Sequence, residues 1–344
     1  MIRRLVIPIA LSFFVVLTQV GIVEHAFAQA NYYEGKTVRF IVGFSAGGGY
    51  DAYTRTIARH MGKHVPGSPV FVVDNMAGAG SLIAANYVYK AAKPDGLTIG
   101  HFIGGLFLQQ LLGKAGVEFD SLKFEYIGVP AQDHFILGIA KSAGITDPDK
   151  WIASKQVVKF GGVATGSGTD DFPNLLKATI GLPIQMVSGY KGTADIRLAF
   201  NSGEIAGVSN SWESTKSTWK KELEIGDLIP ILAATSKPHP ELPKLPLAIS
   251  FAKTDEAKKL IQTVERVHGA SVRPYVVTPG TPKERVQILR KAFMDTMKDP
   301  AFLAEAQKAN LDINADGGAG LEQNVRDIFK LEPALIAKLK EVLK

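Results

Sequence analysis

The sequence predicts an α/β protein of two lobes with a ligand cleft between them. Three observations support this fold class. Apolar, strand-like runs alternate with helical patterns, which is typical of parallel sheets covered by helices. Four of the strands, two in each half of the chain, are followed by turns of glycine, serine and alanine. Two long apolar runs, at 123–140 and 228–235, could carry the chain from one lobe into the other and back.

The first 28 residues have the composition of a secretory signal peptide. Arg3 and Arg4 form a positive start, residues 5–23 are almost wholly apolar, and Ala26-Phe27-Ala28 is an A-x-A cleavage site. We expect cleavage after Ala28 and export of the mature protein to the periplasm. An uncleaved anchor is the alternative, because the apolar stretch is nearly long enough to span a bilayer.

The composition narrows the partners further. The chain has no cysteine, so neither a disulfide nor a lipid-modified N-terminal cysteine is available. Loss of the first 28 residues removes two arginines and one glutamate, which lowers the formal net charge from +6 to +5. The positive charges are scattered and carry no interleaved aromatic residues, so nucleic acid is not expected as a partner. A mild positive field favours small anions instead.

The first strand–turn–helix unit is the one around which the chain is organised. Residues 38–44 form an apolar strand, 45–49 a small-residue turn, and a helix begins at Tyr50. Backbone amides and the positive end of a helix dipole at such a turn suit a phosphate or a carboxylate. Residues 70–74 and 75–81 repeat the strand and turn. Both turns should therefore lie beyond the carboxyl ends of parallel strands, where ligands of such sheets bind.

The remaining elements follow the same alternation. In chain order we expect a helix at 81–92, a strand at 97–103 and a helix capped at 146–148. A strand at 157–163, a third small-residue turn at 164–171 and a helix at 174–179 follow. Then come a strand at 184–187, a fourth turn at 188–193, a helix at 194–201 and a strand at 205–208 leading into 209–212. After these come a strand at 272–278, a helix opened by a capping box at 281–284, a helix opened by Asp299-Pro300, and an amphipathic tail from Leu321 that packs on the first lobe. We assign residues 29–130 plus 236–344 to lobe 1 and 131–235 to lobe 2.

A dinucleotide site is the main alternative for the first turn. Gly47, Gly49 and Ala52 match G-x-G-x-x-A after a strand, and Asp74 ends the next strand, where a ribose-binding acid could lie. The export signal and the second small-residue turn argue against this hypothesis. Asp51 would also repel a pyrophosphate unless it is turned away as a helix cap. A nucleotide-dependent α/β enzyme is the corresponding alternative function.

No catalytic or metal-binding set assembles from the sequence. Ser167 lies in G-S-G without the G-x-S-x-G pattern, and the histidines show no obvious carboxylate partner. The other candidates have structural interpretations: surface or loop positions for His60, His64 and His101, a solvated loop or helix start for Asp170-Asp171, and an i,i+4 pair for Asp51 and Arg55. We therefore predict no catalysis, no metal and no cofactor.

Six motifs carry a family resemblance. They are VRFIVGFSAGGGYD, VFVVDNMAGAGS, KAAKPDGLTIG, SGYKGTAD, VVTPGTP and KDPAF. In this order they resemble the tripartite tricarboxylate transporter substrate-binding proteins, the Bug family of extracytoplasmic solute receptors, over essentially the whole mature chain. The resemblance implies a type II periplasmic-binding-protein fold, a Venus flytrap of two α/β lobes. It also implies a cleft ligand, commonly a carboxylate held partly through ordered water, and a two-subunit membrane permease as partner.

The resemblance also implies ligand-binding residues in both lobes. From lobe 1 these are Phe44, Ser45, Ala46, Gly47, Gly48 and Asp51 in the first turn, and Ala77, Gly78, Ala79, Gly80 and Ser81 in the second. From lobe 2 they are Thr165, Gly166, Ser167, Gly168, Thr169, Tyr190, Lys191 and Asn210. The chain departs from the family pattern at Ser45 and Ala46, where proline is usual, at Phe172, where histidine is common, and at Asn210, where an acid is common. The changes at Phe172 and Asn210 suit a more apolar or aromatic acid.

We therefore expect a monomeric periplasmic receptor that captures a mono-, di- or aromatic carboxylate and delivers it to the permease. Backbone amides and two helix N-termini would neutralise the carboxylate without a buried arginine. An acidic or bulky residue at Gly48 or Gly78 should abolish binding and leave the fold intact. A periplasmic ligand-sensing subunit of a signalling system is an alternative that the sequence does not separate from transport.

Overall fold

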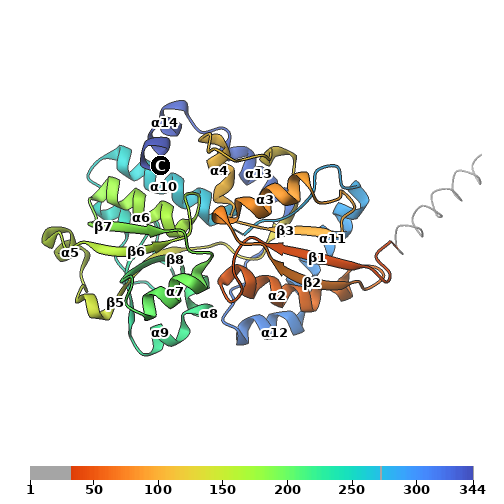
Figure 1. The fold of residues 1–344 in the computed structure, drawn as a ribbon, viewed down its shortest axis with the longest axis horizontal. Coiled ribbons are helices and arrows are strands. Elements are labelled where there is room, and N and C mark those ends of the chain that lie inside the picture. The colour runs from red at the N-terminus through yellow and green to blue at the C-terminus, as the bar shows by residue number, and fades with distance from the viewer. Residues whose placement is uncertain (1–31, 272, 344) are drawn as a thin grey trace, which may run out of the picture.

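The structure, a computed structural model, describes residues 32–271 and 273–343. The expected signal peptide lies outside the described residues. The described chain forms two α/β units side by side, each built around its own sheet (Figure 1). Among the described residues, none of the helices is both long and apolar enough to cross a membrane.

The first sheet has six strands in the order β11-β4-β10-β3-β1-β2. Their bounds are β1 Thr37–Val42, β2 Val70–Asn75, β3 Thr98–His101, β4 Glu125–Val129, β10 Tyr275–Val277 and β11 Asp316–Gly317. Strand β1 pairs in parallel with β2 and β3, as the alternating pattern predicts. Strand β10 instead runs antiparallel to β3 and β4, so the sheet is mixed. The reason is that the chain returns from the second unit at the carboxyl edge, where Tyr275 pairs with His101 at the end of β3.

The second sheet has five strands in the order β7-β6-β8-β5-β9. Their bounds are β5 Phe135–Ala140, β6 Val158–Gly162, β7 Ile184–Ser188, β8 Gly207–Ser211 and β9 Leu228–Ala233. Strand β6 is parallel to β7 and β8, whereas β5 is antiparallel to β8 and β9. The expected outward crossing is confirmed, because β4 belongs to the first sheet and β5 to the second. The expected return at 228–235 is wrong, because these residues form β9 of the second sheet and the chain re-enters the first sheet only at β10.

Helices cover both sheets. Those before the return to the first sheet are α2 Gly49–Met61, α3 Leu82–Lys90, α4 Gly105–Leu111, α5 Pro148–Ser154, α6 Gly168–Ile180, α7 Thr193–Asn201, α8 Trp212–Thr218, α9 Lys220–Glu224 and α10 Asp255–Ser271. Those after it are α11 Lys283–Thr296, α12 Pro300–Lys308, α13 Gly318–Ile328 and α14 Pro333–Val342. Helices α4, α8, α9 and α10 were not expected from the sequence.

The predicted helix starts are confirmed where the cap is a single acid. The Asp147 side chain accepts a hydrogen bond from Lys150 N at the start of α5, and Asp299 accepts from Ala301 N and Phe302 N at the start of α12. The predicted capping box at 281–284 is wrong. Thr281 Oγ1 donates to Thr278 O instead and belongs to the preceding turn.

The last helices differ in what they contact. Helix α13 lies on β4 of the first sheet, as expected for the tail, whereas α14 contacts α6 of the second unit. Helix α10 contacts both α6 and α13, so it joins the two units. We propose that lobe 1 (29–130 plus 236–344) contains the first sheet and that lobe 2 (131–235) contains the second. Helices α10 and α14 of lobe 1 also contact α6 of lobe 2.

Candidate ligand-binding site

A cavity lies where the two sheets' carboxyl ends face one another. Its wall from the first unit consists of Phe44, Gly48, Gly49, Tyr50 and Ile103. Its wall from the second unit consists of Phe135, Val163, Ser167, Gly168, Thr169, Thr193, Asn210, Ser211 and Ser214, and Asp133 and Arg273 come from the segments that join the units. The centre of a water molecule can reach about 30 Å³ of this cavity. The structure therefore has a narrow, contracted cavity.

Three helices begin at this cavity. The first residues of α2, α6 and α7, namely Gly49, Gly168 and Thr193, all line it. Each helix N-terminus carries roughly half a positive charge and amides that have no intrahelical acceptor. The convergence of three such ends favours an anion in the cavity.

A buried arginine lies in the same wall. Arg273 is 1% exposed, its Nε donates to Asp133 Oδ1 at 2.9 Å, and its Nη2 donates to the hydroxyls of Ser211 and Ser214 at 3.1 and 2.6 Å. None of the residues that the structure describes accepts a hydrogen bond from its Nη1. This Nη1 lies 3.4 Å from the position that a Cβ at Gly49 would take, beside the start of α2. A buried donor without an acceptor is costly, so this nitrogen marks a place for an acceptor from a ligand.

The pKa values of Arg273 and Asp133 are both shifted by burial and by the charge of the partner. Burial is the largest effect and lowers the pKa of Arg273, but the charge and hydrogen bond of Asp133 together with the neighbouring Tyr53 and Tyr50 outweigh it, so the pKa is raised and the guanidinium stays charged. Burial raises the pKa of Asp133 to about 6, with Arg273 acting against the shift and Glu213 adding to it. Near neutral pH the pair is an ion pair, and below about pH 6 the positive charge of Arg273 loses its counter-ion.

The first turn lies partly in the cavity. Phe44 and Gly48 line it, whereas Ser45, Ala46, Gly47 and Asp51 do not. Ser45 faces the second unit, where its Oγ donates to Asp195 Oδ2 at 2.6 Å and its N donates to Lys191 O at 3.2 Å. These bonds join the two units beside the cavity.

The carboxylate of Asp51 binds the backbone of the first turn and does not face the cavity. Its carboxylate accepts hydrogen bonds from Gly47 N, Arg55 Nε and Asn75 Nδ2. The expected i,i+4 pair with Arg55 is confirmed. The hydrogen bond with Arg55 is the largest of the effects that lower the pKa of Asp51, and together with those from Gly47 and Asn75 it outweighs the opposing effect of burial.

The second turn does not line the cavity. None of Ala77, Gly78, Ala79, Gly80 and Ser81 belongs to its wall. Ser81 Oγ accepts a hydrogen bond from Ile103 N at 3.0 Å, and a Cβ at Gly80 would lie 2.8 Å from the Cβ of Ala164. This turn therefore packs against the second unit, and its expected role in binding stays a prediction.

The second unit contributes part of the expected set. Ser167, Gly168, Thr169 and Asn210 line the cavity, and within the described part of the chain Asn210 Nδ2 has no hydrogen-bond acceptor. The other four lie outside the wall: Thr165 O accepts from Lys114 Nζ, Gly166 N donates to Asp171, Tyr190 OH donates to Glu204, and Lys191 O accepts from Ser45 N.

Sequence reasoning missed the most strongly charged part of the site. The expectation of a site without a buried arginine is wrong, because Arg273 forms part of the wall. Asp133, Tyr50 and Phe135 were also missed. A signal existed, since Arg273 is the single charged residue in the otherwise apolar run SVRPYVV, and a charge in such a run needs a buried partner or a function.

Several histidines and acids are placed differently from what the sequence suggested. His101 is fully buried and stacks on Tyr275 with ring centroids 4.1 Å apart, so its expected surface or loop position is wrong. Asp170 and Asp171 are buried at the start of α6, so they are not solvated. Asp171 accepts from Gly166 N and lies 3.0 Å from His268 Nε2. This carboxylate partner is 97 residues away in sequence, which is why no local motif revealed it.

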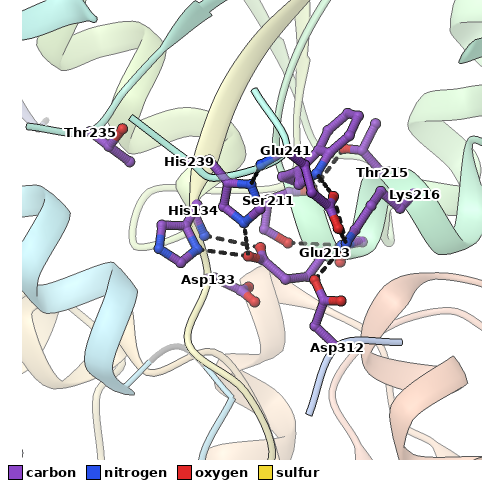
Figure 2. Close-up of polar contacts among 12 residues, drawn as sticks. Asp133, His134, Ser211, Glu213, Thr215, Lys216, Thr235, His239, Glu241 and Asp312 are labelled. Atoms are coloured by element: carbon purple, nitrogen blue, oxygen red, sulfur yellow. Dashed lines mark hydrogen bonds and ion pairs between the residues drawn. The ribbon is translucent and has the colours of Figure 1, made fainter. Parts of the chain in front are cut away.

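Figure 2 shows a second polar cluster, at the segments that connect the two units. Glu213 Oε1 lies 2.7 Å from His134 Nδ1 and 4.0 Å from His239 Nε2, an arrangement that could in principle hold a metal ion. However, His239 Nδ1 accepts a hydrogen bond from Glu241 N at 3.1 Å, so the proton of the neutral ring is on Nε2, the nitrogen that a metal would need. The cluster is better described as a hydrogen-bonded group, and Lys216 continues it to Glu241 and Asp312.

Comparisons of the sequence with known proteins identify a family and a relative. The sequence profile of the tripartite tricarboxylate transporter family receptor matches residues 53–340. The chain is 24% identical over 322 residues to the UPF0065 protein in the gbd 5′ region of Cupriavidus necator, which covers 91% of this chain and 90% of that protein.

Solved structures show the same fold. The periplasmic binding protein BugD is 20% identical with a TM-score of 0.73, over 91% of this chain and 100% of that one. A Rhodopseudomonas palustris protein solved with adipate is 23% identical with a TM-score of 0.71, over 90% and 98%. MatC from Rhodopseudomonas palustris, solved with malate, is 19% identical with a TM-score of 0.69, over 90% and 99%. The two-lobed α/β fold predicted from the sequence is thereby confirmed.

Proposed function

Because this chain belongs to the tripartite tricarboxylate transporter receptor family, we propose that the cavity between its lobes captures a small organic carboxylate for delivery to a membrane permease. The observation that carries the proposal is the buried Arg273 Nη1 beside the start of α2. Arginine is the side chain best suited to a planar carboxylate, and the starts of α6 and α7 add positive potential. Adipate and malate in the two Rhodopseudomonas palustris structures agree with this class of ligand.

Binding would proceed by closure of the lobes. In the open form the first turn and the start of α2 offer amides and Phe44, and the second lobe then brings Asn210 and the start of α6 onto the ligand. The hydrogen bonds of Ser45 to Asp195 and Lys191 would hold the closed form. Exclusion of water strengthens the attraction between the carboxylate and Arg273, because the surrounding dielectric falls.

The finer parts of the proposal concern compartment and partners. The signal-like first 28 residues support export to the periplasm, with the protein acting as a monomeric receptor without catalysis. The partner would be a two-subunit permease that recognises the closed form. A sensing subunit of a signalling system remains the second candidate, and genes for two membrane subunits beside this one, as opposed to a sensor kinase, would separate the two.

A nucleotide-dependent enzyme is less well supported. Gly47, the first glycine of the G-x-G-x-x-A pattern, donates its amide to Asp51, so this donor is not available to a phosphate. The cavity also carries the carboxylate of Asp133, which would repel a pyrophosphate.

A thermal-shift screen of the mature protein tests the proposal. The probes are mono-, di-, tri- and aromatic carboxylates together with nicotinamide cofactors. A ligand at about one hundred times its dissociation constant should stabilise the protein by about 2.7 kcal/mol. A shift with at least one carboxylate is expected, and a shift with the cofactors alone would overturn the receptor function.

A further inference from the structure

We propose that the cavity is selective for a monocarboxylate whose other end is apolar, preferably an aryl group, over dicarboxylates. This inference rests on the proposed function and names the ligand class of the same site. It follows from how donors, charges and apolar side chains are distributed around the wall.

The hydrogen-bonding capacity of the wall fits one carboxylate. Among the described residues that line the cavity, the buried side-chain donors without a protein acceptor are Arg273 Nη1 and Asn210 Nδ2. Both residues are at least nine-tenths buried, at 1% and 5% exposure. The two oxygens of one carboxylate can accept from two such donors, and the described lining residues offer no second pair of unpaired buried side-chain donors.

The charge of the wall also fits one carboxylate. Arg273 is the one cationic side chain among the described lining residues, and Asp133 already offsets its charge in part. A second ligand carboxylate would therefore have no cation of its own and would add to the negative charge of Asp133. Burying such a charge without a partner is strongly unfavourable.

The rest of the wall combines aromatic and aliphatic side chains with the hydroxyl residues Ser167, Thr169, Thr193, Ser211 and Ser214. Phe44 and Tyr50 from lobe 1 lie with ring centroids 4.5 Å apart, and Phe135 and Phe172 from lobe 2 lie 4.7 Å apart. Phe44, Tyr50 and Phe135 line the cavity, and Phe172 supports Phe135 from behind.

Two further features make this surface apolar and narrow. Gly168 lets the ring of Phe135 enter the wall, because a Cβ at Gly168 would lie 2.0 Å from that ring. Ile103 and Val163 complete the apolar surface. A flat, apolar ligand body suits a cavity of this kind better than a flexible polar chain.

Isothermal titration calorimetry with the mature protein tests the selectivity. The probes are benzoate, the neutral isostere benzamide, and the dicarboxylates adipate and malate. Benzoate should bind at least tenfold more tightly than either dicarboxylate, and benzamide should show no binding. Comparable or tighter binding of adipate or malate would overturn the selectivity and leave the proposed function standing. Failure of every carboxylate to bind would overturn both.

Two variants link the selectivity to named atoms. Asn210→Asp replaces the free donor by an acceptor and should weaken benzoate binding at least tenfold while leaving the melting temperature within a few degrees. Arg39→Gln, which removes an exposed arginine paired with Asp74, is the matched control and should leave benzoate affinity unchanged. Unchanged benzoate affinity in Asn210→Asp would overturn the assignment of this donor.

Discussion

The first and second small-residue turns of lobe 1 have the same sequence pattern but different positions. Both follow strands that pair in parallel, β1 and β2, and both precede a helix. The first turn delivers the start of α2 into the cavity beside Arg273. The second packs against Ala164 of the other lobe, and its Ser81 hydroxyl is already bound by Ile103 N.

The difference between the two turns is one of position, because the first places the start of a helix in the cavity and the second does not. In the second turn Ala79, Gly80 and Ser81 all have positive φ, and these residues form a short 3-10 segment before α3. In the first turn Gly48 has an extended conformation and the helix begins immediately at the cavity. Four experiments test this contrast.

The largest effect is expected from Gly49→Val. A Cβ at Gly49 would lie 2.0 Å from Ser214 Oγ and beside Arg273 Nη1, so the side chain would block both closure and the anion position. We expect loss of detectable carboxylate binding by calorimetry, with the far-ultraviolet circular dichroism unchanged. Affinity within threefold of the wild type would show that the start of α2 is not part of the site.

The next largest effect is expected from Arg273→Gln. Hydrogen bonds to charged groups contribute about 1.5–3 kcal/mol, which corresponds to a loss of affinity of roughly tenfold to more than a hundredfold. The melting temperature should also fall, because Asp133 would be left as a buried charge without its partner. The double variant Arg273→Gln/Asp133→Asn should recover stability but not affinity. Recovery of both would mean that Arg273 acts only on the fold.

A moderate effect is expected from pH. Because the pKa of Asp133 is raised to about 6, lowering the pH from 7.5 to 5.5 should protonate it and remove a negative charge beside Arg273. Affinity for a carboxylate that stays ionised should therefore rise several-fold, and Asp133→Asn should abolish this dependence. The same shift makes the contribution of Asp133 to the stability of the ligand-free protein fall as pH rises through about 6. Affinity that falls on acidification would contradict this role.

The smallest effect on affinity is expected from Gly78→Ala. Gly78 has φ of 144°, so any side chain there is strained, and its Cβ would meet Ile83 outside the cavity. We expect destabilisation of about 1–3 kcal/mol in chemical denaturation. Carboxylate affinity should stay within threefold. The sequence indicated that Gly48 and Gly78 are equally important for binding, whereas the structure leads us to expect this only of Gly48. A complete loss of binding in Gly78→Ala would show that Gly78 is also needed.

The parts of the fold that depend on local sequence could be predicted. The strands at 37–42 and 70–75 and the helix starts at Asp147 and Asp299 rest on apolar patterns and caps within a few residues. Helix α10 could also have been found, since Leu260, Ile261, Val264 and Val267 are buried at helical spacing.

The parts that depend on distant contacts could not. The antiparallel entry of β10, the burial of Arg273 against Asp133 140 residues away, and the pairing of His268 with Asp171 arise only when the lobes meet. For the same reason the pattern of the second turn did not reveal that it faces Ala164. The candidate site was therefore predicted where its residues begin helices, at Gly48 and at Ser167 to Thr169, and missed where long-range packing places a charge.

The most direct test is a crystal structure of the mature protein with the tightest-binding carboxylate from the screen. We predict a carboxylate oxygen within hydrogen-bonding distance of Arg273 Nη1, at the start of α2 and between the two lobes. A carboxylate held by residues 77–81 of the second turn, with Arg273 contacting protein alone, would contradict it.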